Sequence, residues 1–181
     1  MRRVFLSLGF LVVMLAAGPS AAQIVSGGGE TMIAGGFGDP LQPLKTNFAF
    51  RIDETPDGGV KGTFDCLALA PETTNGAGSG SFTHNVMYVT GKITELKSIT
   101  KDSASFSGVA TVTGIGAGTE LPFDCNVTSG PVPAASGKSG GVGVTAGGAG
   151  ATMNLVVSGL TFDEVVTNGA IRINPPKRKK K

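Results

Sequence analysis

The sequence is poor in the residues that carry much of enzyme chemistry and of sugar recognition. It contains no tryptophan, one tyrosine (Tyr88) and one histidine (His84). A sugar-binding platform uses aromatic faces, which are nearly missing here. A serine nucleophile needs a histidine beside it, and no Gly-x-Ser-x-Gly string stands at a strand-to-helix turn. We therefore expect no catalytic residue and no enzyme activity, and we interpret His84 as a half-buried or rim residue that shares a strand face with Phe82 and Val86.

Motifs for metals and cofactors are also missing. No Cys-x-x-Cys pair accompanies the single histidine, so a zinc site is not expected. The glycine clusters lack the Gly-Lys-Ser/Thr ending and the βαβ context of a phosphate-binding loop. Two carboxylate pairs are candidates for weak calcium or acid–base chemistry, Asp65 with Asp124 and Asp53 with Asp57. Calcium needs about six to eight oxygen ligands, which the sequence does not supply, so we expect no metal and no cofactor.

Long apolar runs are missing except for one at the N-terminus. Two arginines, Arg2 and Arg3, precede an apolar run from Phe5 to Ala17, which ends in Gly-Pro-Ser-Ala-Ala at residues 18–22. This order is typical of a secretory signal peptide. A membrane anchor is the alternative, but the run is shorter than the roughly 20 residues of a spanning helix. We expect residues 1–22 to be a cleaved signal peptide, Gln23 to be the new N-terminus, and no transmembrane segment after cleavage.

Basic residues are scarce between the two ends of the chain. Residues 23–176 hold eight basic and 13 acidic residues, so the domain is mildly acidic and lacks the basic surface of a nucleic-acid-binding protein. The tail, residues 175–181, begins with two prolines and ends in Lys177, Arg178, Lys179, Lys180 and Lys181. It could attract anionic cell-envelope polymers or lipid headgroups. The alternative is a solvated tail that aids solubility.

The two cysteines lie in the same short string. Phe-Asp-Cys occurs at residues 64–66 and again at residues 123–125. An even cysteine count in an exported chain favours a disulfide, so we expect a Cys66–Cys125 bond. The alternatives are two buried free thiols or a metal pair. If both strings are strands, each cysteine shares a face with its phenylalanine and each aspartate points to the opposite face.

Short β-branched and aromatic runs between glycines and prolines predict strands rather than helices. Residues 47–69 read as a hairpin whose turn, Thr-Pro-Asp-Gly-Gly, spans residues 55–59. Further strands are expected within 81–100, with Gly91 as a bulge or bend, and at 104–115, 120–128, 152–157 and 170–174. Residues 23–46 read as an irregular lead-in, because glycine pairs and prolines interrupt them.

One domain is therefore expected, at residues 47–174. Residues 129–150 are predicted to be a flexible loop, because eight of the 21 residues from 130 to 150 are glycine. The fold class that follows is all-β, an antiparallel sandwich or small open barrel of about eight strands.

Three strings in the second half of the chain carry a resemblance to a known group. They are Val-Thr-Gly-Lys-Ile-Thr-Glu-Leu at 89–96, Ala-Ser-Phe-Ser-Gly-Val-Ala-Thr-Val-Thr-Gly at 104–114, and Gly-Gly-Ala-Gly-Ala-Thr-Met-Asn-Leu-Val-Val-Ser-Gly at 147–159. Over about residues 45–174 the chain resembles the post-COAP type of β domain. That group has an uncharacterised role in secreted bacterial proteins, often beside adhesive or cell-surface modules. The resemblance implies no catalytic residue, and the cysteine pair and the basic tail depart from the group.

Three functions remain, in this order. The first is a secreted or periplasmic structural or adhesive β module of unknown ligand, with the basic tail as a tether to anionic cell-surface polymers. The alternative is a small-ligand-binding domain with an apolar cavity, since several of the ten phenylalanines could line a barrel mouth. A carboxylate hydrolase is the least favoured. The sequence leaves the ligand and the oligomeric state open.

Overall fold

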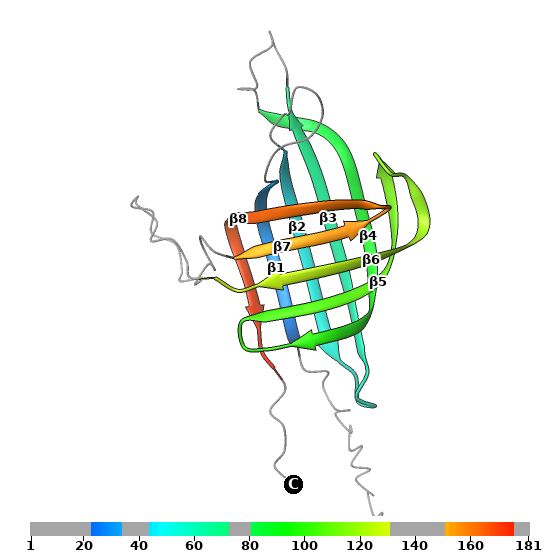
Figure 1. Cartoon of the computed structure of the whole chain (residues 1–181), viewed down its shortest axis with the longest axis vertical. Coiled ribbons are helices and arrows are strands. Elements are labelled where there is room, and N and C mark those ends of the chain that lie inside the picture. Colours follow the sequence, from blue (N-terminus) through cyan, green and yellow to red (C-terminus); the bar gives the residue numbers. More distant parts are fainter. Residues whose placement is uncertain (1–22, 34–43, 73–80, 131–150, 176–181) are drawn as a thin grey trace, which may run out of the picture.

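The computed structural model describes residues 23–33, 44–72, 81–130 and 151–175, which form a closed barrel. Every strand pairs antiparallel with its neighbours in chain order, and the last strand pairs with the first (Figure 1). The eight strands are β1 (Gln23–Ile33), β2 (Lys45–Glu54), β3 (Val60–Pro71), β4 (Phe82–Ile99), β5 (Ser103–Gly114), β6 (Gly118–Thr128), β7 (Thr152–Val157) and β8 (Leu160–Ile173). The predicted all-β antiparallel class is confirmed. The sheet closes on itself, so it is neither an open barrel nor a sandwich.

Strand β1 closes the barrel, so the prediction of an irregular lead-in at residues 23–46 was wrong for residues 23–33; residues 34–43 lie outside the described part of the chain. Its glycines do not interrupt the strand but allow close contacts that a side chain would prevent. A Cβ atom at Gly27 would lie 2.4 Å from the ring of Phe50. At Gly29 it would lie 2.1 Å from the carbonyl oxygen of Asn168 on β8. Glycine is therefore what lets β1 lie between β2 and β8.

The predicted hairpin at residues 47–69 is confirmed by β2 and β3. Its turn is closed by two backbone hydrogen bonds, from the N–H of Thr55 to the oxygen of Gly59 and from the N–H of Gly58 to the oxygen of Thr55, both 2.9 Å long. Gly58 has a φ of 84°, which glycine adopts without strain. The last strand is longer than predicted, because β8 begins at Leu160 rather than at residue 170.

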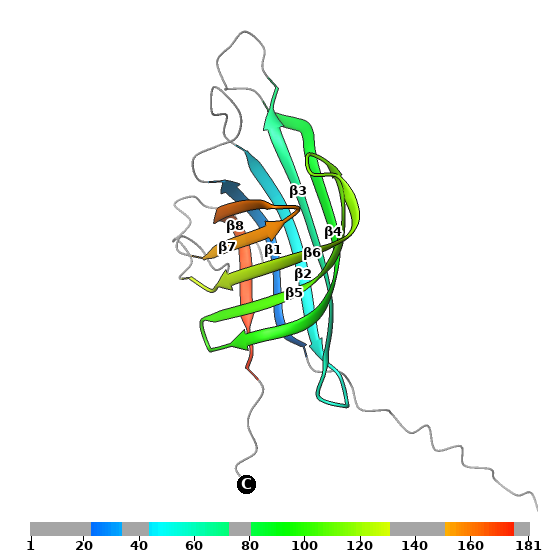
Figure 2. The ribbon, with the colours of Figure 1, turned by 45° about the vertical axis from the view of Figure 1, so that its right-hand side comes forward.

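The strands of the barrel run in two crossing directions. In Figures 1 and 2, β5, β6 and β7 pass across β1, β2 and β3. Strand β8 bends near Gly169, where φ is 104° and a Cβ would meet the Gly28 carbonyl oxygen at 2.2 Å. In β4 the pairing shifts between Ile93 and Glu95 and again between Leu96 and Ser98, rather than at Gly91, the predicted bend. Bulges of this kind bend a strand and let a sheet close.

The interior of the barrel is a packed apolar core. Phe50, Phe64, Phe106 and Phe123 are buried there, and their ring centroids lie between 5.2 and 6.4 Å apart. Along β5 the side chains alternate, with residues 104, 106, 108, 110 and 112 facing inward. The outward face of the same strand carries mostly Ser and Thr. This strand therefore has an apolar face toward the core and a largely polar face on the outside.

Several predicted segments lie outside the described residues. These are the signal peptide at 1–22, most of the glycine-rich loop at 129–150 and the basic tail from residue 176 onward. The described part of the chain contains no helix long and apolar enough to cross a membrane.

Candidate functional site

A buried glutamate stands out among the apolar side chains of the interior. Glu164 lies on β8 between Phe162 and Val166, which face the same way, and it is only 3% exposed. Its neighbour Asp163 points outward, where it accepts a 2.5 Å hydrogen bond from Asn154 Nδ2. Adjacent residues on a strand lie on opposite faces, so the doublet Asp163-Glu164 places one carboxylate in solvent and the other in the core.

Two threonines lie beside this glutamate. Thr31 on β1 and Thr46 on β2 are directly paired and fully buried. The hydroxyl of Thr31 donates a hydrogen bond to Glu164 Oε2. The hydroxyl of Thr46 is buried and has no hydrogen-bond partner among the described residues. We call Glu164, Thr31 and Thr46 the Glu164 cluster. It is the main polar exception in an otherwise apolar core.

The environment of the cluster favours the neutral form of the carboxyl. Burial raises the pKa of Glu164 from 4.5 to about 7, and the neighbouring threonine hydroxyls of Thr31 and Thr46 lower it by a smaller amount. A carboxyl that titrates near neutral pH can exchange a proton under ordinary conditions. Such a group is a candidate functional residue. The thiol of Cys66 lines the same small cavity, but burial raises the pKa of this thiol and disfavours the reactive thiolate.

A small cavity of about 10 Å³ adjoins the Glu164 cluster. Such a volume is at the lower limit for one water molecule. Its lining residues are Ile33, Cys66, Ala68, Met87, Val89, Leu155, Phe162 and Glu164. An apolar ligand of ordinary size does not fit here, so this cavity does not supply the ligand-binding interior of the alternative function.

The predicted Cys66–Cys125 disulfide is wrong, because both cysteines are buried free thiols. They lie on β3 and β6, and two strands, β4 and β5, separate these in the wall of the barrel. Burial raises the pKa of both thiols well above its ordinary value, and the charge of Glu164 raises it further. Oxidation proceeds through the thiolate, which this environment disfavours. The predicted orientation is confirmed, since both cysteines and both phenylalanines of the Phe-Asp-Cys strings face inward.

The two aspartates of these strings point outward but have different partners. Asp65 accepts a 3.0 Å hydrogen bond from the hydroxyl of Tyr88, which raises the pKa of that tyrosine. Asp124 forms an ion pair with Lys97 of β4, which raises the pKa of the lysine. The structure therefore does not bring Asp65 and Asp124 together as an acid–base or calcium pair. Among the residues that the structure covers, no group of three or more His, Cys, Asp or Glu residues could hold a metal ion.

The remaining predicted candidates are not brought together either. His84 is exposed near the start of β4, which contradicts the half-buried position but fits the alternative of a rim position. Asp53 accepts hydrogen bonds from Arg51 Nε on the outer face, and Asp57 accepts one from the hydroxyl of Thr55 in the turn. The bond from Thr55 lowers the pKa of Asp57. The tail residues 177–181 lie beyond the described part of the chain.

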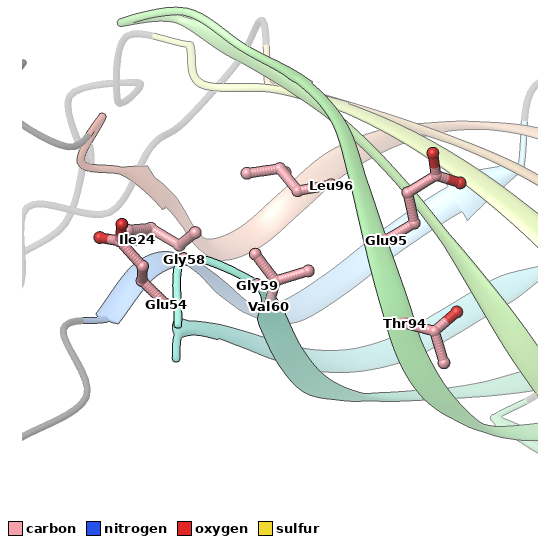
Figure 3. A pocket seen from close by; sticks show the side chains of 8 residues that line it. All are labelled: Ile24, Glu54, Gly58, Gly59, Val60, Thr94, Glu95 and Leu96. Atoms are coloured by element: carbon pink, nitrogen blue, oxygen red, sulfur yellow. The ribbon is translucent and has the colours of Figure 1, made fainter. Parts of the chain in front are cut away.

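A second hollow lies at the opposite end of the barrel from the cavity beside Glu164. It adjoins the turn at residues 55–59. Figure 3 shows its lining, which is Ile24, Glu54, Gly58, Gly59, Val60, Thr94, Glu95 and Leu96. It has a volume of about 320 Å³. We call it the Glu54 pocket. Neither Glu54 nor Glu164 was predicted from the sequence as a site residue.

A weak sequence signal for Glu164 does exist. On the face that contains Phe162 and Val166, the intervening position is a glutamate rather than an apolar residue. This signal depends on assigning residues 160–169 to a strand, and only residues 170–174 were so assigned.

Comparisons of the chain with protein-family models, curated proteins and solved structures found no match. The resemblance to the post-COAP type therefore stays a prediction.

Proposed function

We propose that the chain is an exported, non-enzymatic structural or adhesive β-barrel module that is tethered to anionic cell-surface polymers by its basic tail. The observation that carries this proposal is the packed interior. Rings and aliphatic side chains fill the barrel, and the cavity beside the Glu164 cluster measures only about 10 Å³. A barrel that holds no ligand inside leaves recognition to its exterior.

The basic tail is the part of the chain best suited to an anionic partner. The described residues include seven basic and 12 acidic side chains, so the barrel itself does not attract polyanions. Strand β8 ends at Ile173, and the N–H of Asn174 donates a 2.7 Å hydrogen bond to the oxygen of Ile24. The tail therefore starts from a fixed point at the end of the barrel where β1 begins. Each basic residue near an anionic surface adds about 1 kcal/mol of attraction.

Export remains part of this proposal. Strand β1 begins at Gln23, the residue after the predicted cleavage site, and it pairs there with Asp53. Cleavage after Ala22 would leave every strand of the barrel complete. Sequencing the N-terminus of the protein recovered from a bacterial periplasm or culture medium tests this, and an N-terminus at Met1 would contradict export with cleavage.

The binding experiment compares the wild-type chain with a variant in which the five basic residues at 177–181 are replaced by glutamine. Both are titrated with vesicles that contain an anionic phospholipid, with neutral vesicles, and with a polyanionic cell-wall polymer over a salt series. We expect binding of the wild type to anionic partners only, lost at high salt and absent in the glutamine variant. Equal binding of the two chains, or binding of neither, would contradict the proposal.

A further inference from the structure

The Glu54 pocket forms where two neighbouring strands separate. Strands β3 and β4 pair as far as Gly62 and Ile93, and no pairing between them is present beyond that point. Strand β4 continues to Ile99 by pairing with β5 alone, after two register shifts. Because of the first shift, the inward-facing residue that follows Ile93 is Leu96, three positions further along the strand rather than two. The wall therefore opens beside Val60 at this end of the barrel.

The walls of the pocket are apolar on the side that faces the core. Ile24 is buried, and Val60 and Leu96 are half-buried and pack against the core. In Figure 3, Leu96 points to the same side of β4 as Ile24 and Val60, whereas Thr94 and Glu95 point to the other side. The carboxylate of Glu95 is engaged there, since Ser107 Oγ donates a 3.0 Å hydrogen bond to its Oε2.

The carboxylate of Glu54 is the polar group that borders this apolar surface. It lies on the same side of β4 as Ile24 in Figure 3 and is half-buried. Its side chain makes no ion pair and no hydrogen bond with any residue that the structure describes. A negative charge beside an apolar wall is complementary to a molecule that carries both an apolar part and a positive charge.

We propose that the Glu54 pocket binds a small molecule made of an apolar chain and one cationic group. The apolar chain packs on Ile24, Val60 and Leu96, and the cation lies at Glu54. The volume of about 320 Å³ falls at the lower end of the range of small-ligand sites, roughly 300–1,000 Å³. This proposal does not depend on the tail or on its proposed anionic partners.

The probe for this proposal is n-octylammonium, titrated into the ¹⁵N-labelled full chain and followed by amide chemical shifts. Octanoate is the matched probe with the same chain length and the opposite charge. We expect octylammonium to shift the amides of Ile24, Glu54, Val60 and Leu96, and to bind more tightly than octanoate. No shift at these amides, or equal affinity for the two probes, would overturn the proposal.

Two variants separate the charge from the apolar wall. Glu54→Gln removes the charge at nearly constant size, and we expect it to weaken octylammonium binding about fivefold, the effect of one exposed ion pair. Leu96→Gln should weaken the binding of both octylammonium and octanoate, because both pack an apolar chain on this side chain. The matched control is Glu72→Gln, an exposed glutamate at the opposite end of the barrel, which should change neither affinity. An unchanged affinity in Glu54→Gln contradicts the assignment of the cation to Glu54.

The basic tail begins close to this pocket, so the chain with glutamine at 177–181 is included as well. We expect it to bind octylammonium with wild-type affinity or somewhat more tightly. If octylammonium binds only to this variant, the pocket is occupied by the tail of the chain itself, and the proposal of a small-molecule site is overturned.

Discussion

Glu164 and Glu54 border hollows at opposite ends of this barrel and show how position sets the properties of a carboxyl. Glu164 points into the core beside a cavity of about 10 Å³, and burial raises its pKa to about 7. Glu54 borders a pocket of about 320 Å³ at the opposite end and is half-buried. The first is held by neighbouring threonines and has no room for a ligand. The second has room beside it and no partner in the described chain. The difference teaches that the barrel is tightly packed at one end and open at the other.

Packing at the two sites is compared by shortening one leucine at each. Leu155 is 1% exposed and lines the Glu164 cavity, whereas Leu96 is half-buried at the Glu54 pocket. Leu155→Ala should lower the free energy of unfolding by about 2–5 kcal/mol, because it leaves a cavity in the core. Leu96→Ala should lower the free energy of unfolding by clearly less than Leu155→Ala, because solvent already reaches the side chain of Leu96. Urea denaturation of both variants measures the difference, and equal losses would show that the Glu54 end is packed as tightly as the core.

Glu164 should make stability depend on pH. Its pKa is about 7 in the folded chain against 4.5 as the ordinary value, so the folded state holds a proton that the unfolded state has lost. The contribution of this residue to stability is therefore greatest below pH 4.5, falls as pH rises to 7, and then stays low. A difference of this size corresponds to about 3 kcal/mol.

Replacing the charge tests this directly. Glu164→Gln keeps an oxygen that can accept from Thr31 but cannot ionise, so it should stabilise the protein at pH 8 and remove most of the slope between pH 4.5 and 7. Denaturation curves at several pH values give the measurement. Glu54→Gln is the control, with an expected change within about 0.5 kcal/mol, as is usual for surface positions. The assignment of the slope to burial fails if the two substitutions act alike.

The smallest expected effect concerns the cysteines. Because Cys66 and Cys125 are free, a reducing agent should leave the melting temperature of the purified protein unchanged. Thiol titration should count two thiols per chain after denaturation without reductant, and far fewer in the folded protein, where both are buried. A melting temperature that drops with reductant would show that a disulfide forms after all.

Much of the local structure could be predicted from the sequence because it depends on local chemistry. The Pro-Asp-Gly-Gly string predicted the turn between β2 and β3, and the shared face of phenylalanine and cysteine in the two Phe-Asp-Cys strings followed from alternation along a strand. The predictions failed where the structure of a segment depends on contacts with residues far away in the chain. Glycines in β1 were read as breaks, but their neighbours are Phe50 and Asn168, which only the fold brings close. The cysteine pairing failed for the same reason, since cysteine count does not reveal which strands are adjacent.

The sequence by itself determined the strand class, most strand positions and, within the predicted strands, which side chains alternate toward one face, since a period of two along a strand is a property of the backbone. It also determined the charge contrast between the barrel residues and the tail. Only the tertiary structure decided that the sheet closes through β1 and β8, that both thiols are free, and that Glu164 is buried while Glu54 borders a pocket. These depend on how strands distant in sequence meet, on where β3 and β4 separate, and on how much water the closed wall excludes.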